Sequence, residues 1–183
     1  MWRIIGFTPD KSRDQSGEVK QIISWLQAGE MDFFHIRKPK FGAKETKRYL
    51  ELFPLELRER LCLHDHYEIA EEMGVGGINI NHRNADKNIS LWNGRLSYSC
   101  HSLESVAAHI DRADYVFLSP VFDSRSKHNY KSPFTLSDLQ TAAERGLINE
   151  KVIAMGGVTK GRFDILKQLN FGGGALLGAL WTK

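Results

Sequence analysis

The amino-acid sequence predicts an α/β protein with the fold of a compact (β/α)₈ TIM barrel. Strand-like and helix-like segments alternate along the 183 residues, and eight segments have the character of strands. Strands separated by helical stretches of roughly 10–15 residues indicate βαβ units and a parallel sheet, and eight such units indicate the barrel. The open doubly wound sheet is the alternative. Its dinucleotide-binding form has a GxGxxG motif after the first strand, whereas this chain has GFTPDKS at that position. Because no linker or internal repeat divides the chain, we expect one domain over 1–183.

The first half of the chain supplies four of the eight strands. Residues 2–7, WRIIGF, are short, apolar and partly β-branched, as in a strand. Residues 16–29 have apolar side chains at 19, 22, 23, 25 and 26, the spacing of one helix face, and Gly29 is a plausible stop. The same patterns predict strands over 31–37, 60–65 and 77–80, and helices over 43–53, which Pro54 ends, and 67–74.

The second half supplies the other four strands. Residues 82–94 are polar and lack clear periodicity, so they are predicted to be a loop with at most a broken helix. Residues 102–110 form a predicted helix, with Ser102 as N-cap and a carboxylate in the first turn. Little sequence follows the eighth strand, so the last helix should be missing or reduced. The remaining predictions are strands over 95–101, 114–121, 151–157 and 173–180, and helices over 135–146 and 159–169.

Composition and charge narrow the classes of function. The net charge is only +3 and no block of five Lys or Arg occurs, so the chain is not expected to bind nucleic acid. Small basic groups such as RKPK at 37–40 suit a small anionic ligand. No signal peptide and no run of ~18 apolar residues is present, so we expect a cytoplasmic protein without a membrane partner. Cys62 and Cys100 lie in strand-like runs without zinc-ligand spacing, which favours free buried thiols.

Polar residues gather where the predicted strands end, which is the side of a barrel that carries active sites. Hydroxyl groups and cations are densest after the sixth strand, in VFLSPVFDSRSKHNYKSPF at 116–134. In chain order, the residues at the strand ends are His35, Arg37 and Lys38; His64, Asp65 and His66; Asn79, Asn81, His82, Asn84 and Asp86; Ser99 and His101; Ser119, Ser124, Ser126 and Lys127; Gly156 and Gly157; and Leu177 and Gly178.

Two kinds of ligand site are suggested by these residues. Gly156-Gly157 precede a predicted helix, where glycine lets backbone N–H groups approach a phosphate closely, as in the phosphate site that barrels build after strands seven and eight. The alternative interpretation is that Gly156 and Gly157 allow close packing in the barrel. Asp65 with Asn84 or Asp86 could hold Mg²⁺, which typically takes one or two carboxylates together with substrate phosphates.

Seven segments follow one another along the chain in this order: HIRKP, HDHYEIA, GGININ, SYSCHSLESV, ADYVFLSPVFDSRSK, VIAMGGV and GGALLGAL. Together they resemble the thiamine phosphate synthase family, which includes the thiazole tautomerase of the TenI type. The most specific of them is ADYVFLSPVFDSRSK, which is similar to the family's aDYvgxGpvfpTxTK. The resemblance covers nearly the whole chain and implies a (β/α)₈ barrel. It further implies a transferase of thiamine biosynthesis that joins hydroxymethylpyrimidine diphosphate to thiazole phosphate and releases pyrophosphate with Mg²⁺.

The resemblance assigns roles at the pyrimidine diphosphate. Arg37 falls on the family's diphosphate-binding Arg, and Lys127 on its diphosphate-binding Lys; with Ser99, which falls on the serine at the pyrimidine, these are the implied catalytic residues. Asp65 and Asn84 fall on the two metal-ligating Asp residues, so that Asn84 is a neutral replacement. The remaining implied diphosphate contacts are His35, in place of Gln, His64, in place of Asn, and Lys38. Pro39 falls on a family Lys, which Lys38 or Lys40 would have to replace.

The resemblance also assigns a thiazole phosphate site, formed by Ser124, Ser126, Gly157, Leu177 and Gly178. This half of the site keeps the family pattern better than the diphosphate half does. That asymmetry keeps two alternatives open: a metal-independent thiazole tautomerase, and a barrel that binds thiazole phosphate without catalysis.

The tautomerase's catalytic His falls on Pro120, so His35, His64, His66 or His101 would have to do its acid–base work. Small phosphorylated substrates are the expected partners, and a homodimer is one option for the assembly.

Overall fold

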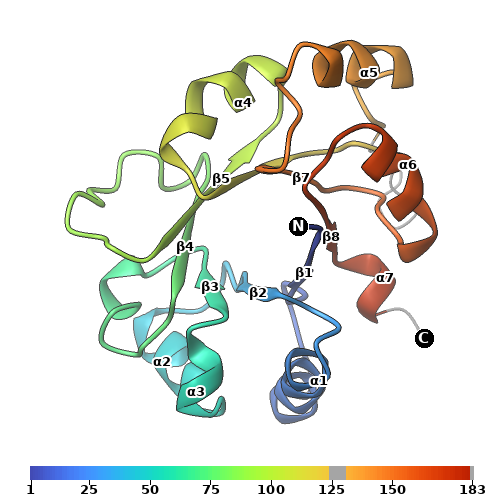
Figure 1. Cartoon of the computed structure of the whole chain (residues 1–183). Coiled ribbons are helices and arrows are strands. Elements are labelled where there is room, and N and C mark those ends of the chain that lie inside the picture. The colour runs from blue at the N-terminus through green and yellow to red at the C-terminus, as the bar shows by residue number, and fades with distance from the viewer. Residues whose placement is uncertain (124–130, 182–183) are drawn as a thin grey trace. The chain divides into compact units, whose positions relative to one another are not determined.

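The computed structural model describes residues 1–123 and 131–181. Eight parallel strands follow one another around a closed barrel in the order β1 to β8, so the predicted fold class is confirmed. Helices or loops connect the strands (Figure 1). The strands are β1 (Arg3–Phe7), β2 (Phe33–Ile36), β3 (Leu61–Leu63), β4 (Gly77–Ile80), β5 (Arg95–Cys100), β6 (Tyr115–Leu118), β7 (Val152–Ala154) and β8 (Gly173–Leu176).

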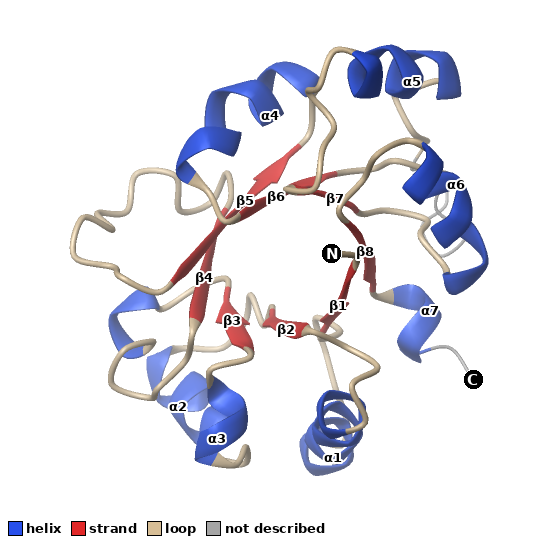
Figure 2. Ribbon diagram, in the orientation of Figure 1, coloured by secondary structure: helices blue, strands red, loops and turns tan. Residues whose placement is uncertain are grey.

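Helices or 3₁₀ turns lie between most successive strands along the chain (Figure 2). Within the described residues, no helix is long and apolar enough to span a bilayer. The α-helices are α1 (Gln15–Gln27), α2 (Ala43–Glu51), α3 (Leu55–Arg58), α4 (Leu103–His109), α5 (Leu136–Glu144), α6 (Phe163–Gln168) and α7 (Gly178–Trp181), and the 3₁₀ turns are η1 (Tyr67–Ile69), η2 (Ile110–Arg112) and η3 (Lys160–Arg162).

The chain divides into two compact units, whose boundaries fall inside β1 and β5. One unit comprises residues 6–96 and contains β2, β3 and β4, which pair in parallel register with His35 opposite Cys62 and Leu63 opposite Ile78. α1 packs its apolar face inward through Val19, Ile22 and Leu26. The prediction of a single domain over 1–183 stays a prediction.

The other unit comprises residues 1–5 and 97–183 and contains β5 to β8. Ser99 lies opposite Phe117, which lies opposite Ile153 on the next strand. Ser102 caps α4 as predicted, because its hydroxyl oxygen accepts from the N–H of Ser105 at 3.2 Å. Thr135 caps α5 in a capping box with Asp138, which explains why this short helix begins there.

Three local predictions differ from the structure. Residues 67–74 form only the 3₁₀ turn η1 and the turns that follow it, and the segment ends at Gly74, whose φ is 69°. The predicted strand 173–180 ends at Leu176 and its last residues belong to α7, since a short apolar run does not distinguish strand from helix. Helix α3 was missed, because Pro54 was taken only as the end of a helix although it also begins the next one.

Residues 81–94 connect β4 to β5 without a helix or strand, as predicted for 82–94. The reduced last helix is also confirmed, since the described part of α7 has four residues. Cys62 and Cys100 are buried and free, again as predicted. The predicted phosphate-facing residues Ser124, Ser126 and Lys127 lie outside the described residues.

Candidate active site

Arg37 follows the last residue of β2 and presents its guanidinium to solvent. Its backbone is held by Thr8, whose hydroxyl oxygen accepts from the Arg37 N–H at 2.8 Å and donates back to the Arg37 carbonyl at 3.2 Å. The guanidinium forms an ion pair with Asp10 through Nη1, and the Arg37 side chain is 28% exposed. The structure therefore places the predicted diphosphate-binding cation where a ligand in solvent can reach it.

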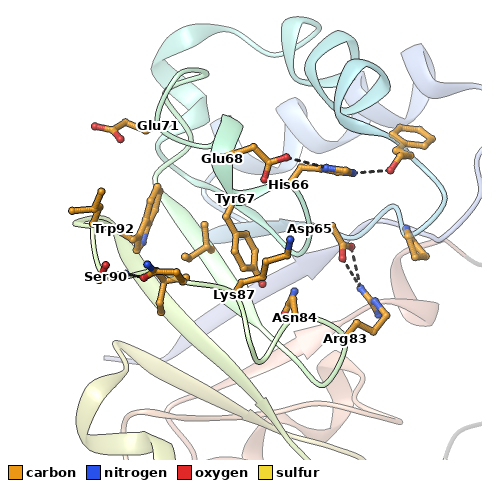
Figure 3. A pocket seen from close by; sticks show the side chains of 16 residues that line it. Asp65, His66, Tyr67, Glu68, Glu71, Arg83, Asn84, Lys87, Ser90 and Trp92 are labelled. Carbon is orange, nitrogen blue, oxygen red and sulfur yellow. Dashed lines mark hydrogen bonds and ion pairs between the residues drawn. The ribbon is translucent and has the colours of Figure 1, made fainter.

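Asp65 and Arg83 form a second ion pair, past the ends of β3 and β4. Nη2 of Arg83 lies 3.0 Å from Oδ2 and 3.3 Å from Oδ1 of Asp65. The side chain of Arg83 is 31% exposed and that of Asp65 is 27% exposed. Figure 3 shows them pointing toward one another. Sequence reasoning found Asp65 and missed Arg83, because the polar loop that carries Arg83 has no periodicity and no motif that marks a cation.

Asn84 is buried, and its side-chain amide forms hydrogen bonds with the backbone. Its Oδ1 accepts from the Asn81 N–H at 2.7 Å, and its Nδ2 donates to the His64 carbonyl at 2.7 Å. The side chain thus fastens the turn after β4 to the end of β3. Only 4% of the residue is exposed.

The side-chain oxygens of Asp65 and Asn84, as they lie in the structure, do not fit a magnesium site. Both carboxylate oxygens of Asp65 face the cationic Arg83, and the Asn84 oxygen faces a backbone N–H. Mg²⁺ needs a near-octahedral shell of oxygen ligands, and a neighbouring guanidinium repels it. Within residues 1–123 and 131–181, no group of three or more His, Cys, Asp or Glu could hold a metal ion. The expectation of Mg²⁺ stays a prediction of the resemblance.

His35 and His64 lie in the interior and not at an accessible surface. The ring nitrogens His35 Nδ1 and His64 Nε2 are 2.9 Å apart, and His64 Nδ1 accepts from the amide of Asn79 at 3.3 Å. Burial, followed by the guanidiniums of Arg37 and Arg83, lowers the pKa of His64 to about 3. Burial and the neighbouring His64 also lower the pKa of His35 well below its ordinary value. Both rings are therefore neutral at pH 7.

Lys38 is likewise buried and fully engaged. Its Nζ lies 2.8 Å from Oε1 and 3.0 Å from Oε2 of Glu18, and it donates to the Pro9 carbonyl at 2.8 Å. The hydroxyl of Tyr49 donates to the same carboxylate. The pKa of Tyr49 is raised well above its ordinary value, first by burial and then by the charge of Glu18. The structure thus joins Lys38 to α1 and α2 and does not bring it to Arg37.

A pocket of about 550 Å³ lies beside the Asp65–Arg83 pair, a volume suited to a small ligand. Its wall comes from the segments after β2, β3 and β4, and includes Phe41, Tyr67 and Trp92. Figure 3 shows the ion pair at one end of this wall and Trp92 toward the other. An anion that enters this end therefore meets the exposed part of Arg83.

In the unit that contains β5 to β8, His101 lies beside the segment that follows β6. Its Nδ1 is 2.9 Å from the carbonyl oxygen of Ser119, which is joined to Pro120 by a cis peptide bond. Ser99, the predicted pyrimidine contact, is half-buried near the end of β5. Pro120 has no titratable group, and among the described residues His101 contacts the carbonyl of the residue before it.

Gly156 and Gly157 have positive φ values of 87° and 63°, which favour glycine. A Cβ at Gly157 would lie 2.5 Å from the Asp123 carbonyl oxygen and 2.8 Å from that of Phe122. Close approach of the segment after β6 therefore explains this glycine, as the packing alternative proposed, and a phosphate role stays a prediction. Of the other predicted thiazole phosphate residues, Leu177 follows β8 and Gly178 begins α7.

Comparisons with known proteins agree with this architecture. Residues 5–180 match the family model described as thiamine monophosphate synthase. The crystal structure of thiamine phosphate pyrophosphorylase from Bacteroides thetaiotaomicron superimposes with a TM-score of 0.85 at 32% identity, covering 98% of this chain and 84% of that one.

Two curated relatives are both called thiamine-phosphate synthase. The protein of Caldicellulosiruptor bescii is 26% identical over 86% of this chain and 74% of its own. That of Limosilactobacillus reuteri is 24% identical over 98% of this chain and 88% of its own. The match of the family model to nearly the whole chain shows that this protein belongs to the thiamine monophosphate synthase family.

Proposed function

We propose that this protein is a thiamine phosphate synthase, which joins hydroxymethylpyrimidine diphosphate to thiazole phosphate and releases pyrophosphate. The observation that carries the proposal is the position of Arg37. It stands directly after β2 with an exposed guanidinium, in a chain that belongs to this family. A guanidinium binds phosphate oxygens in a fixed, bidentate geometry, and it stays protonated throughout the pH range in which enzymes work.

The chemistry asks the protein for charge neutralisation and positioning. The bond between the pyrimidine's methylene carbon and the diphosphate oxygen breaks, and both electrons leave with pyrophosphate. The electron-rich pyrimidine stabilises the positive methylene, and the thiazole nitrogen attacks it to form the new C–N bond. Arg37 and Lys127 would stabilise the leaving group, Ser99 would orient the pyrimidine, and Ser124, Ser126 and the backbone at Gly157, Leu177 and Gly178 would hold the thiazole phosphate.

The test is direct synthesis from the two substrates. The purified protein is incubated with hydroxymethylpyrimidine diphosphate and thiazole phosphate, with Mg²⁺ and separately with EDTA, and thiamine phosphate is measured by chromatography. We expect product that depends on both substrates. Absence of thiamine phosphate under both conditions contradicts the proposal.

A thiazole tautomerase is the second candidate, and His101 is the observation that favours it. Its ring contacts the Ser119 carbonyl beside Pro120, where the tautomerase's histidine would stand. His35 and His64 are buried with lowered pKa values, so neither could exchange protons with a ligand in solvent near pH 7. His66 is engaged by the Phe41 carbonyl at 2.9 Å.

The two candidates are separated by their products. Isomerisation of the thiazole phosphate tautomer is followed by its ultraviolet spectrum in the wild type and in His101→Gln. Turnover that His101→Gln abolishes, without any thiamine phosphate from the synthase substrates, would support the tautomerase. Binding of thiazole phosphate without turnover of either substrate set would support the non-catalytic barrel.

We also propose a cytoplasmic location and small phosphorylated substrates as partners, in keeping with this reaction. The homodimer stays a prediction, and light scattering on the purified chain measures it.

A further inference from the structure

The Asp65–Arg83 pair stands where the family pattern implies a metal ligand. The carboxylate contacts only Nη2 of the guanidinium. Among the described residues, Nη1 and Nε of Arg83 have no hydrogen-bond partner. A guanidinium carries five N–H donors in a rigid fork, so one Arg83 can hold Asp65 and still offer an edge to a second anion.

Arg37, which follows β2, has a similar arrangement two strands away from Arg83, which follows β4. Its Nη1 contacts Asp10, and its Nη2 and Nε have no partner in the described part of the chain. The strands β2, β3 and β4 are parallel neighbours, so the residues that follow them lie at one edge of the sheet. Arg37 follows β2 and Arg83 follows β4, so the two arginines come after the strands on either side of β3, at the same edge of the sheet.

The local charges balance without a metal ion. A bare carboxylate at Asp65 would repel a diphosphate, and a divalent cation is one way to reverse that repulsion. Here Arg83 neutralises Asp65, and Asn84 adds no negative charge because it is an amide. Exposure of about a third of each side chain leaves the pair open to a ligand in the adjoining pocket.

We propose that Arg83 takes the place of a divalent cation, so that the diphosphate of the pyrimidine substrate is bound between the guanidiniums of Arg83 and Arg37 while Asp65 orients Arg83. This inference rests on the proposed function for the identity of the anion. Diphosphate binding then needs no Mg²⁺, and Asp65 serves as a positioning residue through Arg83.

Inorganic pyrophosphate is the probe, because it is the leaving group itself and requires no turnover. Its Kd is measured by isothermal titration calorimetry in EDTA and in excess Mg²⁺. We expect binding in EDTA, with Mg²⁺ tightening it less than threefold. In Arg83→Gln the Kd should rise tenfold or more. Arg145→Gln, which removes an exposed guanidinium at the end of α5, should leave it unchanged.

A third variant tests the substitution of metal by arginine directly. Arg83→Gln combined with Asn84→Asp removes the guanidinium and restores a second carboxylate. We expect this double variant to bind Mn²⁺, detected by the loss of the free-ion signal in electron paramagnetic resonance, whereas the wild type should not. Circular dichroism establishes that each variant is folded.

The inference is overturned if the wild type binds pyrophosphate only with Mg²⁺, if Mg²⁺ tightens binding threefold or more, if Arg83→Gln raises the Kd less than tenfold, or if pyrophosphate does not bind. It is likewise overturned if the wild type binds Mn²⁺ or the folded double variant does not. These binding results need no turnover, so the inference and the proposed function can fail separately. If thiamine phosphate forms only with Mg²⁺, the inference is contradicted and the proposed synthase function is supported. If pyrophosphate binds without metal but no thiamine phosphate forms, the proposed function is contradicted and metal-free binding of the anion is supported.

Discussion

At the scale of single residues, His64 makes the stability of the protein depend on pH. Its pKa is lowered from 6.5 to about 3, chiefly by burial, so between these values the unfolded chain binds a proton that the folded chain does not. The free energy of unfolding therefore falls as the pH falls through this window, by about 1.4 kcal/mol per pH unit. His35 contributes in the same direction.

We expect the free energy of unfolding to be about 2 kcal/mol smaller at pH 5 than at pH 7 from His64 alone. Urea denaturation at the two pH values measures the difference. His64→Gln removes the titrating imidazole, so the difference between pH 7 and pH 5 should shrink by about that amount. An equal pH dependence in the wild type and the variant would contradict this account.

The local geometry of Gly157 predicts that adding a Cβ there lowers the free energy of unfolding. In Gly157→Ala, the φ of 63° costs about 1–2 kcal/mol, and the contacts with the carbonyl oxygens of Asp123 and Phe122 add about 1–3 kcal/mol. Gly146→Ala is the matched control, because φ there is 74° and nothing lies within 4 Å of the added Cβ. Thermal or urea unfolding that shows equal losses for the two variants would refute the role of close contact.

At the scale of elements, a buried ion pair ties α1 to the end of β2. The side chains of Glu18 and Lys38 are each 3% exposed, and Tyr49 on α2 donates to the same carboxylate. Burying one charge without its partner is costly, since the lost hydration is not replaced. The pair is consequently a strong constraint on how these three elements pack.

Glu18→Gln should lower the free energy of unfolding by about 3–5 kcal/mol, because the ammonium of Lys38 would stay buried without a countercharge. The exposed pair Lys47–Glu72 provides the control, with side chains 36% and 58% exposed. Glu72→Gln should cost about 0–1 kcal/mol. Chemical denaturation measures both, and similar losses would argue against burial as the cause.

At the scale of the whole molecule, membership of the family predicts which lysine after β6 in the sequence is needed for turnover. Lys127 falls on the family's diphosphate-binding lysine, and Lys131 lies outside that pattern. Lys127→Ala should abolish thiamine phosphate formation and leave the unfolding curve unchanged. Lys131→Ala should keep wild-type activity. Normal turnover in Lys127→Ala would remove this residue from the proposed site.

Much of the fold could be predicted from the sequence because it depends on local patterns. Apolar runs and helical spacing located all eight strands, and the Ser102 cap marked the start of α4. Strand ends, α3 and the turn η1 were less predictable, because they depend on where neighbouring elements stop the chain. Of the candidate site, Arg37 and Asp65 were foreseen as polar strand-end residues, and their ion-pair partners were not.

The sequence by itself therefore determined the order of strands and helices, the barrel they imply, and the polar residues that follow the strands. Only the tertiary structure decided the partner of each charge. Lys38 finds Glu18 at a separation of 20 positions, and Asp65 finds Arg83 at a separation of 18. Such pairs form when packing orients two distant side chains toward one another, and no local periodicity encodes that orientation.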